Sequence, residues 1–151
     1  MKAVVQRVIS SQVDVDGKTI GKTDKGLLVL LGVSEDDTEF DAEILAKNIA
    51  NLSIFCDEND KMNLSVLDIN GGILAISNFT LCADTRKGNR PSFSSAKAPN
   101  EANELYELFV SKLKAEGVKS VNIGQFGADM KIPSLLDGPV TIIMDSCIWR
   151  K

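Results

Sequence analysis

Apolar and polar residues alternate in several short stretches of the chain, a spacing that is typical of strands. Residues 2–8 predict a first strand, and residues 12–20 alternate around Asp16-Gly17, a two-residue hairpin signal. The run at 27–31 is continuously apolar, so it predicts a strand in the centre of a sheet. Further strands are expected at 52–55, 72–81, 120–124 and 140–148.

A spacing of three to four residues between apolar positions predicts two helices. The first would be capped by Asp36, Asp37 or Thr38. Its buried stripe would consist of Phe40, Ile44, Leu45, Ile49 and Leu52. The second would follow Pro99 and end at Gly117. Its apolar positions are Leu105, Phe109 and Leu113.

The length of the chain limits how these elements can be organised. With 151 residues, 44% of them hydrophobic, the chain can fill one core but is too short for two ordinary domains. We therefore expect residues 1–151 to form a single domain of the mixed α/β (α+β) class. A mixed, mostly antiparallel sheet would curl into a barrel-like core, and the two helices would cover it.

Two features of the composition indicate a soluble protein of the cytoplasm. Gln6 and Arg7 interrupt the start of the chain before a signal-like apolar run develops, and no later stretch approaches the length of a membrane span. The three cysteines, Cys56, Cys82 and Cys147, are far apart, which argues against a disulfide framework and against close-spaced metal ligation. We expect reduced thiols, no membrane contact, and neither a metal nor a cofactor.

The chain contains no histidine, which excludes several kinds of active site. There can be no Ser-His-Asp or Cys-His nucleophile system, no His-ligated zinc and no imidazole general base. An enzyme built from this chain must use oriented backbone donors, a carboxylate or lysine base, a cysteine thiolate, or a group of the substrate itself.

Charge is unevenly distributed, although the net charge is only −4. Residues 35–43 carry six acidic side chains and no basic one. A later segment is basic: its cations are Arg86, Lys87, Arg90 and Lys97, and Asp84 is the acid close by. Such a loop can neutralise a few phosphates of a nucleic acid, but a solvated loop without a partner explains the charges equally well.

Two segments carry polar or backbone groups where functional sites are often found. Residues 77–81 place two hydroxyls and an amide at the end of the apolar strand 73–76. Gly138-Pro139 has no side chain at the glycine and no N–H at the proline, so its carbonyl oxygens can be left bare. Taken alone, the first segment fits ordinary strand alternation with Asn78 and Thr80 facing water, and the second an ordinary turn before a strand.

Seven short motifs, in order along essentially the whole chain, together resemble the D-aminoacyl-tRNA deacylases. They are Gln6-Arg7-Val8, the segment GLLVLLGV at 26–33, Lys61-Met62-Asn63-Leu64, residues 77–81, Arg90-Pro91-Ser92-Phe93, Ala128-Asp129-Met130 and residues 137–141. The resemblance implies hydrolysis of a D-amino acid ester on the 3′-terminal adenosine of transfer RNA, with glycyl-tRNA as a second substrate. It also implies a homodimer in which Gly138-Pro139 of the partner subunit, joined by a cis peptide bond, completes each pocket.

The resemblance also assigns roles to individual residues. Ser77, Asn78, Phe126 and Met130 would bind the substrate or wall its pocket, and Arg7 would brace the glycine-proline step. Gly138 and Pro139 would accept the substrate's α-ammonium through their carbonyl oxygens. Asn78 stands where the family usually has glutamine, and Leu136 where asparagine is common. These two departures concern the binding network more than the activity.

The chemistry of an aminoacyl ester suggests how a site without histidine can work. We expect the backbone N–H groups of Phe79 and Thr80 to stabilise the oxyanion, and the neighbouring 2′-hydroxyl of the adenosine to activate a water. The competing hypothesis makes Thr80 a covalent nucleophile, which needs a general base such as Asp84.

Two other classes of function remain open at this stage. A thiol enzyme would use Cys82 with Arg86 lowering its pKa, although a cysteine in this context is more often a small buried residue. A noncatalytic RNA-binding dimer would use the same basic loop without cleaving any ester.

Overall fold

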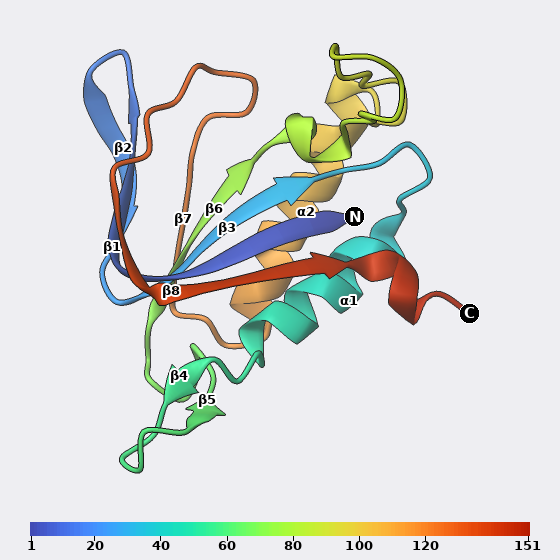
Figure 1. Ribbon diagram of the computed structural model, residues 1–151. Helices are drawn as coiled ribbons and strands as arrows, with labels where there is room; N and C mark the ends of the chain where they lie inside the picture. Colours follow the sequence, from blue (N-terminus) through green and yellow to red (C-terminus); the bar gives the residue numbers. More distant parts are fainter.

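The computed structural model describes residues 1–151. A six-stranded mixed sheet forms the centre of the fold, and helices α1 and α2 lie against one face of it (Figure 1). The strands are β1 (Lys2–Val15), β2 (Lys18–Thr23), β3 (Gly26–Gly32), β6 (Gly72–Ser77), β7 (Ser120–Ile123) and β8 (Ser134–Asp145), with β4 (Phe55–Cys56) and β5 (Met62–Leu64) in a separate hairpin. The helices are α1 (Glu39–Ala50), α2 (Pro99–Ala115) and the short 3₁₀ helices η1 (Phe79–Cys82) and η2 (Ser146–Trp149).

The sheet combines antiparallel and parallel pairs, as expected. The order is β2-β1-β3-β6-β7, and β8 pairs with β1. β1 is antiparallel to β2, β3 and β8, whereas β6 is parallel to both β3 and β7. Parallel pairs need crossovers, and α1 and α2 lie in the two crossovers that lead from β3 to β6 and from β6 to β7. The carboxyl ends of β3 and β6 therefore meet at one edge of the sheet.

The two edges of the sheet approach each other, so the sheet nearly closes into a barrel. A Cβ atom at Gly21 in β2 would lie only 2.6 Å from the carbonyl oxygen of Ile123 in β7. Only glycine lets the two backbones come this close. The predicted curling of the sheet into a barrel-like core is confirmed.

Each face of the sheet has its own apolar cluster. The larger one fills the space between the sheet and the helices, with Leu27, Ile73 and Phe109 fully buried in it. The smaller cluster lies on the opposite face and consists of Val8, Val13, Leu28, Leu74 and Ile76. Met130 and Ile132 pack against it, so the segment after β7 covers this face near the end of β6.

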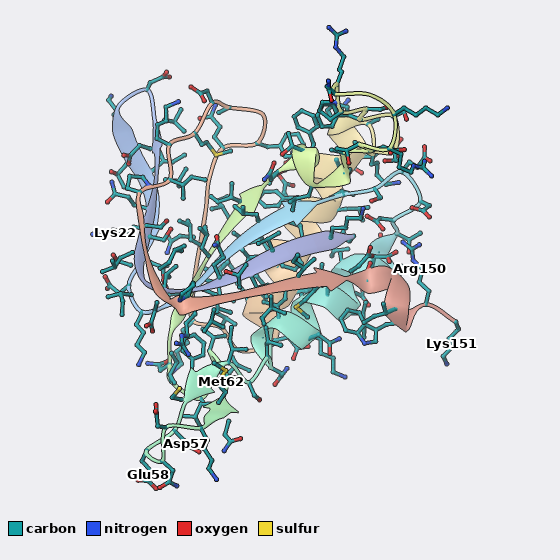
Figure 2. The ribbon with its side chains drawn as sticks, in the orientation of Figure 1. Lys22, Asp57, Glu58, Met62, Arg150 and Lys151 are labelled. Carbon is teal, nitrogen blue, oxygen red and sulfur yellow. The ribbon has the colours of Figure 1, made fainter.

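Several predicted strand boundaries are wrong. One strand, β1, runs through both residues 2–8 and the first half of the predicted hairpin, and it turns at Asp16-Gly17 as expected. The predicted strand 72–81 ends at Ser77, because the chain turns into η1. The expected strand at 52–55 is reduced to the two residues of β4, in the hairpin that projects from the body of the protein (Figure 2).

The first helix has the predicted position but not the predicted face. Thr38 is its N-cap, and the Asp41 carboxylate accepts the Thr38 N–H at 2.9 Å in a capping box. Phe40 is 45% exposed, so its place in the buried stripe was wrong. Alanines take buried positions instead: Ala42 and Ala46 share the buried side of α1 with Leu45 and Ile49, and the close neighbour of α1 is α2. Neither α1 nor α2 is long and apolar enough to cross a bilayer.

A buried ionic network joins the two ends of the chain beside α1. The amino group of Met1 donates to Asp37 and, at 2.7 Å, to the Ser146 hydroxyl. The Ser146 hydroxyl in turn donates to Asp41 at 2.6 Å, and Arg150 donates to Asp41 at 2.9 Å and to Asp37 at 2.7 Å. Burial raises the pKa of Asp41, but the hydrogen bonds from Ser146, Thr38 and Arg150 outweigh it and lower the pKa to about 2.

Asp41 should therefore stabilise the fold in a pH-dependent way. Its pKa is about 2 in the folded protein against 3.8 for a free side chain. The lowered value stabilises the folded state by about 2 kcal/mol above pH 4, and this contribution is lost as the pH falls toward 2. We expect Asp41→Asn to unfold at lower urea concentration than the parent at pH 7, and the two proteins to converge at low pH. A gap in unfolding free energy that stays constant from pH 7 to pH 2 would contradict this assignment.

Candidate functional site

A hollow of about 330 Å³ lies where β6 ends, on the face of the sheet away from the helices. The end of β6, the start of η1 and the segment after β7 form its walls. Most of its lining is apolar, and the exceptions include the polar side chains of Ser77 and Asn78. The lining residues are Leu30, Ile76, Ser77, Asn78, Phe79, Phe126, Gly127, Ala128, Met130 and Ile132.

The end of β6 leaves backbone donors without an intrahelical acceptor. The Asn78 N–H donates to the Leu31 carbonyl at 2.7 Å, which closes the pairing between β6 and β3. The chain then enters η1, where the first intrahelical bond runs from the Leu81 N–H to the Asn78 carbonyl at 3.3 Å. The N–H groups of Phe79 and Thr80 precede this bond, so they have no acceptor in the helix.

Thr80 and Asn78 are linked by their side chains. The Thr80 hydroxyl donates a hydrogen bond to the amide oxygen of Asn78. An amide oxygen accepts a hydrogen bond but does not remove a proton at neutral pH. The side chain of Asn78 is one methylene shorter than that of glutamine but still reaches the Thr80 hydroxyl within the same turn. That hydroxyl therefore has a hydrogen-bond acceptor, but not a base that could remove its proton.

A second, larger hollow of about 430 Å³ adjoins the first. The two share Ser77, Phe79, Phe126 and Gly127, so they form one continuous depression. Phe79 is 58% exposed, and its ring meets that of Phe93 edge-on at a centroid distance of 5.1 Å. The remaining walls of the second hollow come from Val33, Ala96, Lys97, Ala98, Pro99 and Ala102.

Gly138-Pro139 lies inside β8 and not in a turn before it. In the pairing of β1 with β8, Gln6 faces Thr141 and Val8 faces Leu136. Between these two pairs β1 has a single residue, Arg7, whereas β8 has the four residues 137–140. This segment bulges out of the sheet. The peptide bond between Gly138 and Pro139 is cis, as the resemblance implies, and both residues are exposed.

Arg7 fixes the base of this bulge in its own chain. Its Nε atom donates to the Asp137 carbonyl at 3.3 Å and pairs with the Asp137 carboxylate at the same distance. Its Nη1 atom donates to the Ile54 carbonyl at 2.8 Å. Gly138 has a φ of +129°, and a Cβ atom there would lie 2.8 Å from the backbone nitrogen of Val140. The backbone of the bulge is therefore held from one side by Arg7 and requires glycine at 138.

The structure thus divides the residues predicted from the sequence into two groups. Ser77, Asn78, Phe79, Phe126 and Met130 come together around the first hollow, and Thr80 lies beside it. Gly138, Pro139 and Arg7 line neither hollow of their own chain. The lining also includes the apolar residues Leu30, Ile76 and Ile132, which were not predicted because runs of core residues carry no chemical signal of their own.

The alternative nucleophiles and bases are engaged elsewhere. Cys82 is 2% exposed, and its sulfur lies 3.6 Å from the Ser34 hydroxyl, so it is a small buried residue. Asp84 pairs with Arg86 at 2.6 Å, and hydrogen bonds from Arg86 lower the pKa of Asp84 to about 2. A carboxylate with so low a pKa is a weak base. No three Cys, Asp or Glu side chains are grouped in a way that could hold a metal ion.

The fold and the site define a single-domain α/β protein with an apolar pocket at the end of a parallel strand and no histidine. Residues 4–145 match the family model described as D-Tyr-tRNA(Tyr) deacylase. A D-aminoacyl-tRNA deacylase of Thermosipho melanesiensis is 57% identical over 146 residues, and one of Clostridioides difficile is 58% identical; each match covers 97% of both chains. The chain belongs to the D-aminoacyl-tRNA deacylase family of hydrolases.

Two solved structures share the fold. One, named c-Myc DNA Unwinding Element Binding Protein, superposes with a TM-score of 0.91 at 40% identity and covers 96% of this chain and 98% of its own. The other, described as a probable eukaryotic D-amino acid tRNA deacylase, has a TM-score of 0.80 at 15% identity and covers 95% and 97%. The second likeness concerns the fold alone.

Proposed function

We propose that the protein hydrolyses the ester bond between a D-amino acid and the 3′-terminal adenosine of transfer RNA, and so removes wrongly charged D-amino acids. The observation that carries this proposal is that η1 begins at the edge of an apolar pocket, which Phe79 lines, with the N–H groups of Phe79 and Thr80 free of an acceptor in the helix. The continuous depression offers one hollow for the aminoacyl group and a neighbouring hollow, with Phe79 and Phe93 beside it, for the adenosine. Aromatic rings are suitable surfaces on which a base can stack.

The reaction needs little more than these donors. An aminoacyl ester is an activated acyl group, so a placed water can attack its carbonyl carbon, and the negative charge then gathers on the carbonyl oxygen. The N–H groups of Phe79 and Thr80 stabilise that oxyanion, a contribution of about 10²–10³ in rate per donor. The 2′-hydroxyl of the adenosine accepts the proton of the attacking water and passes its own proton to the 3′-oxygen as the bond between that oxygen and the carbonyl carbon breaks, which releases the free amino acid and the transfer RNA.

In this mechanism the Thr80 hydroxyl positions the side chain of Asn78, and Thr80 does not form a covalent intermediate. Its hydroxyl donates to Asn78, which cannot act as a base, and the carboxylate of Asp84 is paired with Arg86. We expect Thr80→Ala to reduce kcat by no more than about tenfold, the order of one hydrogen bond. Single-turnover cleavage of D-tyrosyl-tRNA measures this loss. Complete loss of turnover, with normal folding and substrate binding, would instead support a nucleophilic threonine.

Selection for D-amino acids depends on a second copy of the chain. The exposed Gly138 and Pro139 of the partner subunit would enter the pocket, where their carbonyl oxygens accept the substrate's α-ammonium. A side chain of the L configuration then points into fixed backbone, while one of the D configuration points outward. Glycine has no side chain to exclude, so glycyl-tRNA is a second substrate.

The surface of β8 supports a homodimer of this kind. Leu135, Leu136 and Ile143 lie on this strand with their side chains largely exposed, and Ile143 is 80% exposed. Ile143 pairs with Val4, which in turn pairs with Leu30 on the face away from the helices. Exposed apolar side chains that continue a sheet surface are typical of a face covered by a second subunit. We place the enzyme in the cytoplasm, where charged transfer RNA is found.

The proposed function is tested by mixing the protein with D-tyrosyl-tRNA and L-tyrosyl-tRNA in parallel. We expect the D ester to be cleaved rapidly and the L ester to decay at its spontaneous rate. Alkylation of the reduced protein should leave the D-specific activity unchanged, because Cys82 is buried and takes no part. Equal decay of the two esters, or no decay beyond the spontaneous rate, would remove the proposed function.

Nucleic-acid binding without catalysis is the second candidate function. It is favoured by the name of the solved relative at 40% identity, a DNA unwinding element binding protein. The same assay separates the two candidates, because a binding protein leaves both esters intact even when a gel shift shows that it retains the nucleic acid.

A further inference from the structure

The basic loop, residues 84–97, is fastened to the site at both ends. Asp84 and Ser92 exchange two backbone hydrogen bonds, at 2.7 and 2.9 Å, and so close its outer part. The Ser95 hydroxyl donates to the carbonyl of Cys82, the last residue of η1, at 2.9 Å. Phe93 meets Phe79 at the pocket. The outer part of the loop therefore has a fixed position beside the depression, at the end of the molecule where η1 and the start of α2 lie (Figure 1).

The four cations of this loop differ in what they contact. Arg86 pairs with Asp84, and Lys97 is mostly buried with its ammonium group donating to the Glu35 carbonyl at 2.9 Å. Lys87 and Arg90 are exposed and make no ion pair. Two cations without a counterion thus lie on the loop that carries Phe93 to the wall of the depression, in a protein whose net charge is −4.

The opposite wall of the depression offers no comparable charge. The segment after β7 carries Lys131, whose ammonium group pairs with Asp129 at 3.1 Å. An adenosine bound in the second hollow would still be joined through its 5′ phosphate to the rest of the strand, which has to leave across one wall. The phosphates should cross the wall formed by the basic loop, because its cations are unpaired. A single strand can be held there through its backbone, without contacts that read its sequence.

We propose that Lys87 and Arg90 bind the backbone phosphates of the nucleotides that precede the terminal adenosine. This inference rests on the proposed function, because it concerns the same bound transfer RNA. Arg90 forms planar hydrogen bonds with phosphate oxygens and Lys87 acts as a point charge. The two residues hold the 3′ strand while the pocket beside them cleaves the ester, so they raise the affinity for transfer RNA without taking part in the chemistry.

The test compares two substrates that differ in their phosphates. D-Tyrosyl-tRNA carries the phosphates of the 3′ strand, whereas D-tyrosyl-adenosine carries none. We expect the double variant Lys87→Ala/Arg90→Ala to lower kcat/KM for D-tyrosyl-tRNA about tenfold at low salt, and to reduce the slope of log kcat/KM against log salt by about 1.4, because each single-strand phosphate contact contributes about 0.7. Cleavage of D-tyrosyl-adenosine should be unchanged.

A matched control is available on β2. Lys18 and Lys22 are also exposed and make no ion pair, and Lys22 lies on the far side of the protein from the basic loop (Figure 2). Lys18→Ala/Lys22→Ala removes the same charge and should leave the salt slope as it is. An equal loss on both substrates, an unchanged slope in the loop variant, or the same loss in the control variant would overturn the inference. If the parent protein cleaves neither substrate, the proposed function fails first and the inference falls with it.

Discussion

Phe79→Pro is expected to lower kcat for D-tyrosyl-tRNA by about 10²–10³, because it removes one of the two N–H groups assigned to the oxyanion. Proline fits this position well. It would occupy the first residue of η1, where proline is favoured. Asn78 before it is extended, with φ −145° and ψ 90°, so its ψ has to rise by about 30° to reach the range usual before proline. The change therefore deletes a donor at the cost of a small backbone adjustment.

Phe79→Ala is the matched control, since it removes the same ring and keeps the N–H. Single-turnover rates and thermal unfolding of both variants separate the loss of a donor from the loss of packing. We expect the alanine variant to retain most of the chemical rate and to bind more weakly, because its ring no longer meets Phe93. Equal rates in the two variants would show that the backbone donor at 79 is not used.

Gly138→Val is expected to lower kcat/KM for D-tyrosyl-tRNA by about 10- to 100-fold, and to reduce the preference for the D ester over the L ester. A Cβ atom at this position would lie 2.8 Å from the Val140 nitrogen and 2.9 Å from its side chain, at a φ of +129° that L residues rarely adopt. The backbone has to shift, and both carbonyl oxygens shift with it. Loss of hydrogen bonds to an ammonium group costs about 1.5–3 kcal/mol, which corresponds to this range.

Gly17→Ala is the control for the general cost of a side chain at positive φ. Gly17 has a φ of +77° in the β1–β2 turn and no atom within 4 Å of the added Cβ. Both variants are assayed on the D and L esters, together with their unfolding temperatures. A Gly138→Val protein that is stable and keeps the parental D-to-L ratio would count against chiral selection by this backbone.

Local sequence signals predicted the elements whose structure is decided locally. Asp16 and Gly17 both have positive φ in the predicted hairpin turn, and Gly117 has φ +109° just beyond the end of α2. The run at 27–31 became the central strand β3, whose residues contribute to the apolar clusters on both faces of the sheet, so both of its faces have to be apolar. In each case a few neighbouring residues carry the whole signal.

Elements that depend on distant contacts were predicted less well. Phe40 has the spacing of a buried residue, but α1 turns its alanines into the core and leaves this ring at the surface. Residues 77–81 alternate like a strand, yet pairing with β3 ends at Ser77 and the chain turns. The bulge in β8 depends on its register against β1 and on Arg7, neither of which can be read from residues 137–141 alone.

The residues of the pocket, too, were predicted from the sequence only where a local signal marks them. The polar residues at 77, 78 and 80 stand out in the sequence, and β6 pairs in parallel with β7, so that the end of β6 and the segment carrying Phe126 and Met130 reach the same place. The apolar residues between them resemble any core residue until the sheet is assembled. Residues 138 and 139 line neither hollow of their own chain, so the role proposed for them requires a second copy.

The measurement that tests this arrangement most directly mixes two variants whose activity is strongly reduced. In a homodimer whose pockets are completed by the partner, a Phe79→Pro chain and a Gly138→Val chain together form one intact pocket per mixed dimer, because the normal η1 of one chain meets the normal bulge of the other. After the two are refolded together, we expect D-tyrosyl-tRNA cleavage to recover to about a quarter of the parental rate, since half of the dimers are mixed and each has one good pocket. A mixture no more active than its separate components would contradict a pocket shared between two copies of the chain.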